Sequence, residues 1–136
     1  MKPSDNSNLN IARIPTSWSD KRRNFFRIWL ELMRPMHKLT SKEIEVLAAF
    51  LQKRLELSKS IIDSNILDQT LLGTEIRKQI REELNLSATH FHVIVTKLKK
   101  AGIIVNNRIN KRYIPNIKGN TESYKLVFLF EFEKDA

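Results

Sequence analysis

The chain has 136 residues, of which 41% are hydrophobic and 29% charged, a composition that supports one compact domain with an ordinary core. It contains no cysteine, which excludes disulfides and thiolate metal sites. Lysine and arginine total 24 against 15 acidic residues, and the formal net charge of +9 favours a polyanionic partner by attraction and counterion release.

The N-terminal segment is predicted to hold an arm and an added helix. Residues 1–15 are rich in Asn and Ser, end at Pro15 and are expected to form a flexible arm. Residues 16–36 carry bulky apolar side chains at helical spacing, with Pro35 ending the run, and predict an amphipathic helix. Its aromatic stripe has two interpretations: it packs on the core of the same chain, or it docks against another molecule.

The next helix is predicted to begin after Thr40. Thr40 and Glu43 have the spacing of a capping box, in which each side chain satisfies a free backbone N–H of the first turn. One inward stripe follows at helical spacing, formed by Ile44, Leu47, Leu51 and Leu55. Residues 57–73 remain ambiguous between a linker with a short helix and a strand near Leu71 and Leu72 that pairs with a later hairpin.

Two short helices joined by a tight corner are predicted between Gly73 and Gly102. Thr74 is placed to cap the first helix, and Ser87 is placed to cap the second. The inward stripe of the second helix consists of Phe91, Ile94, Val95 and Leu98. Gly102 is expected to end it, because glycine readily adopts the left-handed conformation found at helix ends.

A β-hairpin is expected after Gly102. Its first strand would begin at Ile103 and continue beyond Asn106 and Asn107 to Ile114, with the turn in residues 115–121. The second strand would run from Tyr124 to Phe132. Alternation places one set of its side chains on a face that is expected to join the core: Tyr124, Leu126, Phe128, Phe130 and Phe132.

The stretch from Leu86 to Ile104 resembles a known family of DNA-binding domains. The run Leu86-Ser87-Ala88-Thr89, followed by Leu98-Lys99-Lys100-Ala101-Gly102-Ile103-Ile104, is similar to the recognition helix and wing entry of MarR-type winged helix-turn-helix proteins. The resemblance implies an α+β winged-helix domain over residues 37–136, with a three-helix core and a β-hairpin wing. Winged helices also serve as protein–protein modules, so the function must be argued from the exposed residues.

In that family the outward residues of the second helix enter the major groove of duplex DNA. The matching positions of helix 88–101 are Thr89, His90, His92, Val93, Thr96, Lys97 and Lys100. The basic residues expected to contact phosphates from the wing are Arg108, Lys111, Arg112 and Lys118. One such helix reads only a few base pairs, so we expect a homodimer or larger assembly through the N-terminal helix.

Neither an enzyme nor a metal or cofactor site is expected. His90 and His92 are two residues apart, so on a helix they point in different directions and chelate one ion poorly. The three glycines do not form a phosphate-binding loop. The sequence therefore predicts no catalytic residues.

Transcriptional regulation is the expected role, in the cytoplasm with the nucleoid or in a virion. No apolar run reaches the roughly 20 residues that span a bilayer, and the polar N-terminus does not resemble a signal peptide. One alternative is a replication or packaging protein that binds DNA. Another is a structural or adaptor protein, for instance in a phage particle. The aromatic helix, the polar arm and Val93 favour the adaptor, whereas the basic wing favours DNA.

Overall fold

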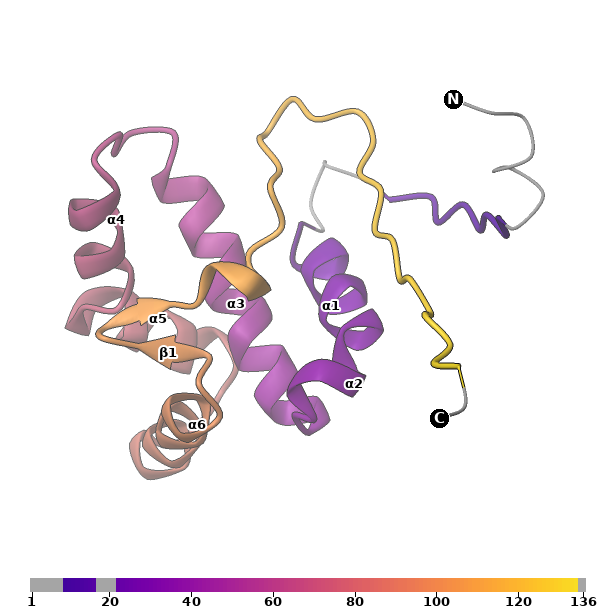
Figure 1. Ribbon diagram of the computed structural model, residues 1–136. Coiled ribbons are helices and arrows are strands. Elements are labelled where there is room, and N and C mark those ends of the chain that lie inside the picture. The colour runs from indigo at the N-terminus through magenta and orange to yellow at the C-terminus, as the bar shows by residue number, and fades with distance from the viewer. Residues whose placement is uncertain (1–8, 17–21, 135–136) are drawn as a thin grey trace.

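The computed structural model describes residues 9–16 and 22–134 and shows an α+β fold in which helices precede a small hairpin (Figure 1). The helices are α1 (Arg22–Leu32), α2 (Arg34–His37), α3 (Ser41–Leu57), α4 (Ser64–Leu71), α5 (Thr74–Glu83) and α6 (Ala88–Lys100). The strands β1 (Ile104–Val105) and β2 (Arg108–Ile109) pair antiparallel, and a 3₁₀ turn, η2 (Lys111–Tyr113), follows them.

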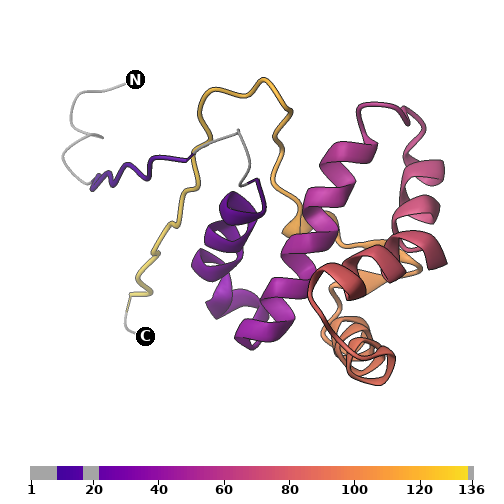
Figure 2. The ribbon, with the colours of Figure 1, turned by 180° about the vertical axis from the view of Figure 1, so that it is seen from behind.

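Helix α3 is the centre of the fold. Helix α1 packs along one side of it, and α4, α5 and α6 cover the other side (Figures 1 and 2). Residues 46–51 of α3 are all buried. Consecutive helical residues point in different directions, so such a run requires neighbours on more than one face. The single inward stripe predicted from the sequence is therefore only part of the buried surface of α3.

The aromatic stripe of α1 packs into the core of the same chain. The buried side chains here are Phe26, Trp29, Leu30 and Met33. The indole Nε1–H of Trp29 donates a hydrogen bond of 3.1 Å to the carbonyl of Tyr113, which ties α1 to η2. The prediction that Pro35 ends the helical run is wrong. The break falls at Met33, and Pro35 lies in the first turn of α2, where a missing N–H costs no hydrogen bond.

The predicted N-terminal arm is described only in part. Residues 9–16 form neither helix nor strand, and their side chains are exposed. Residues 1–8 of the predicted arm lie outside the described residues, as do residues 17–21, where the added helix was expected to begin.

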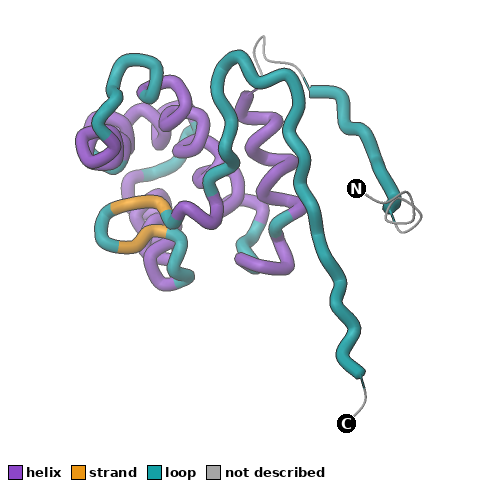
Figure 3. The backbone as a smooth tube through the Cα atoms, turned by 45° about the horizontal axis from the view of Figure 1, so that its top comes forward, coloured by secondary structure: helices purple, strands orange, loops and turns teal. Residues whose placement is uncertain are grey.

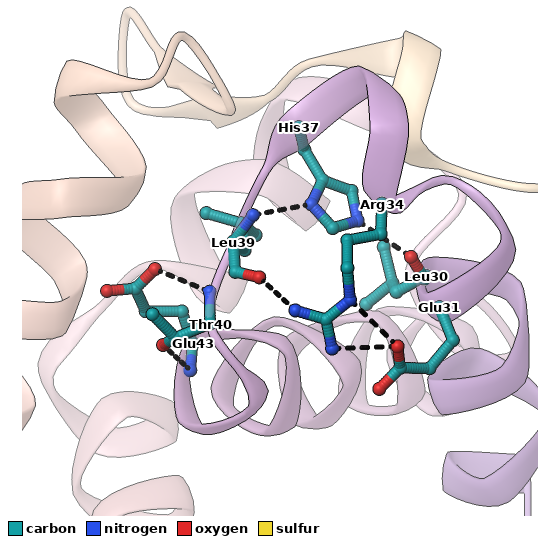
Figure 4. Close-up of polar contacts among 7 residues, drawn as sticks. All are labelled: Leu30, Glu31, Arg34, His37, Leu39, Thr40 and Glu43. Carbon is teal, nitrogen blue, oxygen red and sulfur yellow. Dashed lines mark hydrogen bonds and ion pairs between the residues drawn. The ribbon is translucent and has the colours of Figure 1, made fainter.

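Polar contacts fix the junction between α1, α2 and α3 (Figure 4). The capping box at Thr40 and Glu43 is confirmed. The Thr40 N–H donates to Oε1 of Glu43 at 3.0 Å, and the Glu43 N–H donates to Oγ1 of Thr40 at 3.3 Å. Arg34 adds a second tie, because its guanidinium donates to the Glu31 carboxylate at 2.7 Å and also to the Leu39 carbonyl. These bonds hold the first turn of α3 against α1.

His37 completes this junction as a buried, neutral side chain. The Leu39 N–H donates to its Nδ1 at 2.9 Å, so the proton is on Nε2, which donates to the Leu30 carbonyl at 2.7 Å. Burial lowers the pKa of His37 below its usual value of 6.5. The bond to Leu30 opposes this effect, and the nearby Arg34 charge adds to it. Protonation would place a charge in the core and break the bond from Leu39.

We expect the free energy of unfolding to fall as the pH is lowered below about 6.5, the usual pKa of an unfolded-chain histidine. Below that pH the unfolded chain binds a proton that folded His37, with its lowered pKa, does not bind. Above it the ring is neutral in both states, and its contribution is complete. Urea unfolding at several pH values should show a weaker dependence in His37→Asn than in the wild type. The matched control His92→Asn, at an exposed histidine, should keep the wild-type dependence.

The segment between α3 and α5 folds as a short helix. Asp63 caps α4, because its Oδ1 accepts from the N–H groups of Asn65 and Ile66 at 2.9 and 3.1 Å. Of the two alternatives for residues 57–73, the helix is the one observed, and the strand near Leu71 and Leu72 is wrong. Leu71 is fully buried at the end of α4 instead.

The β-hairpin is shorter than the sequence predicted. Asn106 and Asn107 have φ of 52° and 60°, and two consecutive positive φ values make the tight two-residue turn that suits strand twist. This turn closes β1 onto β2 locally, with Ile104 opposite Ile109. The prediction of one strand continuing to Ile114 is therefore wrong.

The predicted second strand, Tyr124 to Phe132, is also wrong. We call residues 122–134 the C-terminal segment. It is extended but belongs to no sheet, and most of its side chains are exposed. Its start touches the helices: the Tyr124 ring centroid lies 5.7 Å from that of Trp29 and 6.1 Å from that of Phe25, Leu126 is half-buried, and Phe128 is 41% exposed. Of the face expected to join the core, Phe130 and Phe132 are therefore in solvent, whereas Tyr124, Leu126 and Phe128 are partly covered.

Candidate nucleic-acid interface

Helices α5 and α6 are the two short helices, joined by a tight corner, that the sequence predicts between Gly73 and Gly102. Gly73, and not Thr74, is the N-cap of α5, because Thr74 already has helical geometry. A Cβ at position 73 would come within 3.2 Å of the Gln69 carbonyl oxygen, so the close passage from α4 to α5 favours glycine. Ile76 and Ile80 are buried on the inner face of α5, and Leu84, which follows the helix, is half-buried.

The corner between α5 and α6 is held by local backbone bonds. Asn85 has φ of 56°, and the Leu86 N–H donates to the Arg81 carbonyl at 2.9 Å, which reverses the chain. Leu86 is buried under the corner. Ser87 is the N-cap of α6, as predicted, and its Oγ accepts from the His90 N–H at 3.0 Å. The corner therefore sets the direction of α6 relative to α5.

The end of α6 is equally well defined. Gly102 has φ of 76°, and the Ile103 N–H donates to the Leu98 carbonyl at 3.0 Å, the bonding pattern of a glycine-terminated helix. Ile103 is buried and leads directly into β1. The predicted stop at Gly102 is confirmed, so the hairpin starts at a fixed position beside α6.

Helix α6 has one buried and one exposed face. The predicted inward stripe of Phe91, Ile94, Val95 and Leu98 is confirmed as buried. The seven predicted contact positions lie on the other side: Thr89, His90, His92, Val93, Lys97 and Lys100 are exposed, and Thr96 is half-buried. Helical periodicity puts Thr89, Val93, Thr96 and Lys100 on the centre line of this face. Val93 is 46% exposed, an apolar patch among polar neighbours.

Lys97 is not free, because it pairs with an acid on α3. Its Nζ lies 3.3 Å from Oε2 of Glu43, a carboxylate that is itself buried. Burial alone would raise the pKa of Glu43, but the hydrogen bonds from Thr40 and the pairing with Lys97 outweigh it and lower the pKa. The pair joins α6 to the first turn of α3. The pair could not be predicted from the sequence, because the two residues lie on separate helices and no local pattern links them.

The wing arginine Arg108 is directed toward α4. Its guanidinium hydrogen-bonds the side-chain oxygen of Asn65, and its Nε lies 3.8 Å from Oδ2 of Asp68. Asp68 is buried and also lies 3.8 Å from Nε of Arg54 on α3. Arg108 is still half exposed, but part of its charge is neutralised by Asp68.

The other basic residues of the predicted wing are dispersed. Lys111 and Arg112 are exposed on η2, where Arg112 lies over the Tyr113 ring and near the Met36 sulfur. Lys118 lies near Ser58 and Lys59, at the end of α3, while Lys97 contacts Glu43 at its beginning. At 1.5 Å per residue these two places are roughly 20 Å apart along α3. The structure therefore gathers the α6 residues but separates Lys118 from them.

Two features of this surface were absent from the predicted site. Lys99 is exposed beside Lys100 and extends the basic end of α6. The hairpin tip, Asn106 and Asn107, is exposed next to β1, which packs on α6. The Asn-Asn pair was a usable signal, because asparagine tolerates the positive φ that a two-residue hairpin turn needs.

Other kinds of site have little support in this structure. Among residues 9–16 and 22–134, no three His, Asp or Glu side chains gather as a metal-binding group. A cavity of about 390 Å³ lies between α1, α3 and residues 114–119, with apolar walls that include Phe26 and Leu51 and with Arg54 and Lys118 at its edge. None of the seven α6 positions lines it.

No helix in the described part of the chain has the length and apolar character required to cross a bilayer. Comparison of the chain with family models, with curated proteins and with solved structures gave no match.

Proposed function

We propose that this chain is a winged helix-turn-helix protein of the MarR-like kind that binds double-stranded DNA and regulates transcription, without enzymatic activity. In this proposal α5 and α6 are the helix-turn-helix and the β1–β2 hairpin is a short wing. The observation that carries it is the exposed face of α6, which displays hydrogen-bonding and basic side chains on a helix whose opposite face is buried.

The size and chemistry of α6 suit the major groove of B-DNA. The groove is about 12 Å wide and admits one α-helix. Thr89 and Thr96 can hydrogen-bond to base edges or phosphates, and Val93 can contact a thymine methyl group. Lys99 and Lys100 stand at the C-terminal end of α6, where they can reach phosphates at the edge of the groove. The hairpin tip lies beside this helix and can contact the DNA phosphate backbone next to the groove.

Two copies are needed for tight binding in this proposal. A single recognition helix reads few base pairs, and paired half-sites supply the missing affinity. The N-terminal helices can contribute to such an assembly, because Leu32 and Met36 are exposed beside the buried stripe of α1. The protein would then act where the genome is, in the cytoplasm or in a virion.

Fluorescence anisotropy of a mixed-sequence duplex, titrated with the full chain at several salt concentrations, tests the proposal. We expect the logarithm of the affinity to fall linearly with the logarithm of salt concentration, with a slope of about 0.9 per phosphate contacted. A folded protein that does not bind the duplex at low salt would contradict it. The basic charge would then belong to contacts with another protein.

A structural or adaptor role is the second candidate. Val93 at the centre of the exposed α6 face and the exposed C-terminal segment are apolar surfaces of the kind that contact proteins. Salt-dependent duplex binding favours the DNA proposal, and its absence favours the adaptor. A replication or packaging protein would use the same DNA surface and would differ from a regulator in where on the genome it binds.

Under this proposal, Glu43→Gln should strengthen duplex binding several-fold at low salt. The amide oxygen still accepts the Thr40 N–H, but it no longer neutralises Lys97, so a full positive charge becomes available to phosphate. Glu43→Ala frees Lys97 in the same way and also removes the carboxylate that accepts from the Thr40 N–H, while the Thr40 cap itself remains, at a cost of about 1 kcal/mol in the free energy of unfolding. Anisotropy and urea unfolding of both variants separate the two effects. Unchanged affinity in both would place Lys97 outside the DNA contact.

A further inference from the structure

The C-terminal segment, residues 122–134, pairs with no strand in the described part of the chain and exposes several apolar side chains. Figure 3 shows it as a tube that leaves the helices after passing α1. Phe130 is 79% exposed and Phe132 is 91% exposed, with Val127 and Leu129 almost as accessible. Within the described part of the chain, residues 122–134 form no backbone hydrogen bonds. Aromatic side chains in such numbers are costly to leave in water.

The composition of this segment is that of a strand. Residues 124–132 contain four aromatic side chains, one β-branched residue (Val127) and no glycine or proline. Figure 3 shows the backbone of this segment drawn out. Its even-numbered side chains, from Tyr124 to Phe132, are all apolar, whereas the odd-numbered ones include Lys125, Glu131 and Glu133. An extended strand with free N–H and C=O groups pairs readily with another strand.

We propose that the C-terminal segment pairs antiparallel with the C-terminal segment of a second copy of this chain, in the register centred on Phe128. In this register Lys125 lies opposite Glu131, and Glu122 lies opposite Lys134, and two-fold symmetry makes each ion pair twice. The apolar side chains also meet: Tyr124 faces Phe132, Leu126 faces Phe130, and Phe128 faces its own copy. In this one register the opposite charges of the two strands face each other, and so do their apolar side chains.

Other registers lose this complementarity. Centring the pair on Val127 places Lys125 opposite Leu129 and leaves no opposite charges facing each other. Centring it on Leu129 retains Lys125 opposite Glu133 but puts Glu131 opposite Val127. A centre between two residues places even-numbered side chains opposite odd-numbered ones, so that the aromatic face of one strand adjoins the charged face of the other. The sequence therefore favours one register. A segment that associates only through nonspecific hydrophobic contacts would favour none.

The fold already anchors one end of the paired strands. A two-stranded ribbon alone is marginally stable in water and needs cover for its apolar face. Tyr124 packs on Phe25 and Trp29 of α1, and the half-buried Leu126 lies on the same face of the strand. In the dimer this face continues through Phe132 of the partner strand, opposite Tyr124. The pairing does not depend on the proposed DNA binding, and its test contains no nucleic acid.

Charge reversal tests the register in the full-length chain. Light scattering and analytical ultracentrifugation should show a dimer in the wild type. Lys125→Glu or Glu131→Lys alone turns two attractive pairs into repulsive ones and should raise the dimer dissociation constant by about ten-fold or more. An equimolar mixture of the two variants restores both pairs in the heterodimer and should regain wild-type affinity. The double variant with both changes in one chain should behave as the mixture does.

Cysteine cross-linking tests the same register independently, because the wild-type chain has no cysteine. Directly opposite residues have Cα atoms about 5 Å apart, within the range of a disulfide. Phe128→Cys should therefore cross-link with itself. Val127→Cys or Leu129→Cys alone should cross-link about ten-fold more slowly, since the two copies of each are offset along the strands by roughly 7 Å. Mixing these two variants should restore fast cross-linking, and both retain Phe128.

Three outcomes would overturn the proposal. A monomer at every concentration would mean that the segment binds a different protein or none. Equal cross-linking of the three single variants would mean association without register. Species larger than a dimer, unaffected by charge reversal, would mean general aggregation of the exposed aromatic residues. Duplex binding measured on the same samples keeps a failure here distinct from a failure of the DNA proposal.

Discussion

The double variant Lys99→Ala, Lys100→Ala is expected, under the proposed function, to bind duplex DNA on the order of 50-fold more weakly than the wild type at about 0.1 M salt. Each phosphate contact contributes about 0.9 to the slope of affinity against salt, so loss of two contacts should flatten it by about 2. Both lysines are exposed at the C-terminal end of α6, whereas Lys97 is paired with Glu43. The measurement is anisotropy across a salt series.

The matched control removes the same charge from the other end of the molecule. Lys59 and Lys118 are exposed near the end of α3, away from the Glu43 turn that Lys97 contacts. Lys59→Ala, Lys118→Ala should leave the salt slope within error of the wild-type value, because those ammonium groups do not reach the proposed groove contact. Equal losses in the two double variants would indicate general attraction to a polyanion, without a specific role for α6.

The second large effect is expected in the core. Phe50→Ala should lower the free energy of unfolding by about 3–5 kcal/mol, the usual cost of truncating a buried phenylalanine. Phe50 is completely buried in α3, and its ring centroid lies 6.2 Å from that of Phe91 on α6. Because a domain of this size is stable by roughly 5–15 kcal/mol, the variant should be near the limit of folding. Urea unfolding followed by the fluorescence of buried Trp29 measures the effect.

Two further variants make this test interpretable. Phe50→Leu keeps most of the side-chain volume and should cost only about 1 kcal/mol. Phe130→Ala makes the same truncation at an exposed position and should change the stability of the monomer by less than about 0.5 kcal/mol. A loss below about 1 kcal/mol in Phe50→Ala would show that α3 and α6 are not packed through this ring.

Features that depend on neighbouring residues were predictable from the sequence. The capping box at Thr40, the cap at Ser87 and the glycine stop at Gly102 were each expected and each observed. A cap satisfies N–H groups within three or four residues of itself, so its signal is local. At α5 the predicted cap is wrong by one residue, because the N-cap is Gly73 and not Thr74. The Gln69 carbonyl oxygen lies close to where a Cβ of residue 73 would be, a contact that favours glycine there and that no local pattern reveals.

Features that depend on distant partners were not predictable. Alternation in residues 124–132 predicts a strand, but alternation does not say which other strand would pair with it. The turn at Asn106 and Asn107 closes the hairpin within six residues, 104–109, which leaves the C-terminal segment without a strand beside it. The apolar pattern predicts one face of the core, whereas the structure leaves Phe130 and Phe132 of that face in solvent.

The sequence by itself determined the order of the core helices, the caps and stop around α6, and the inward stripe of that helix, because each of these follows from neighbouring residues. It also determined the excess of positive charge, which follows from the count of charged residues. Only the tertiary structure decided which charges are available. It paired Lys97 with Glu43, tied Arg108 to Asp68, and separated Lys118 from α6 by the length of α3. It also buried α3 from two sides and left the C-terminal segment unpaired. These outcomes depend on contacts between residues far apart in the chain, whose positions are set by packing of whole helices and by no local pattern.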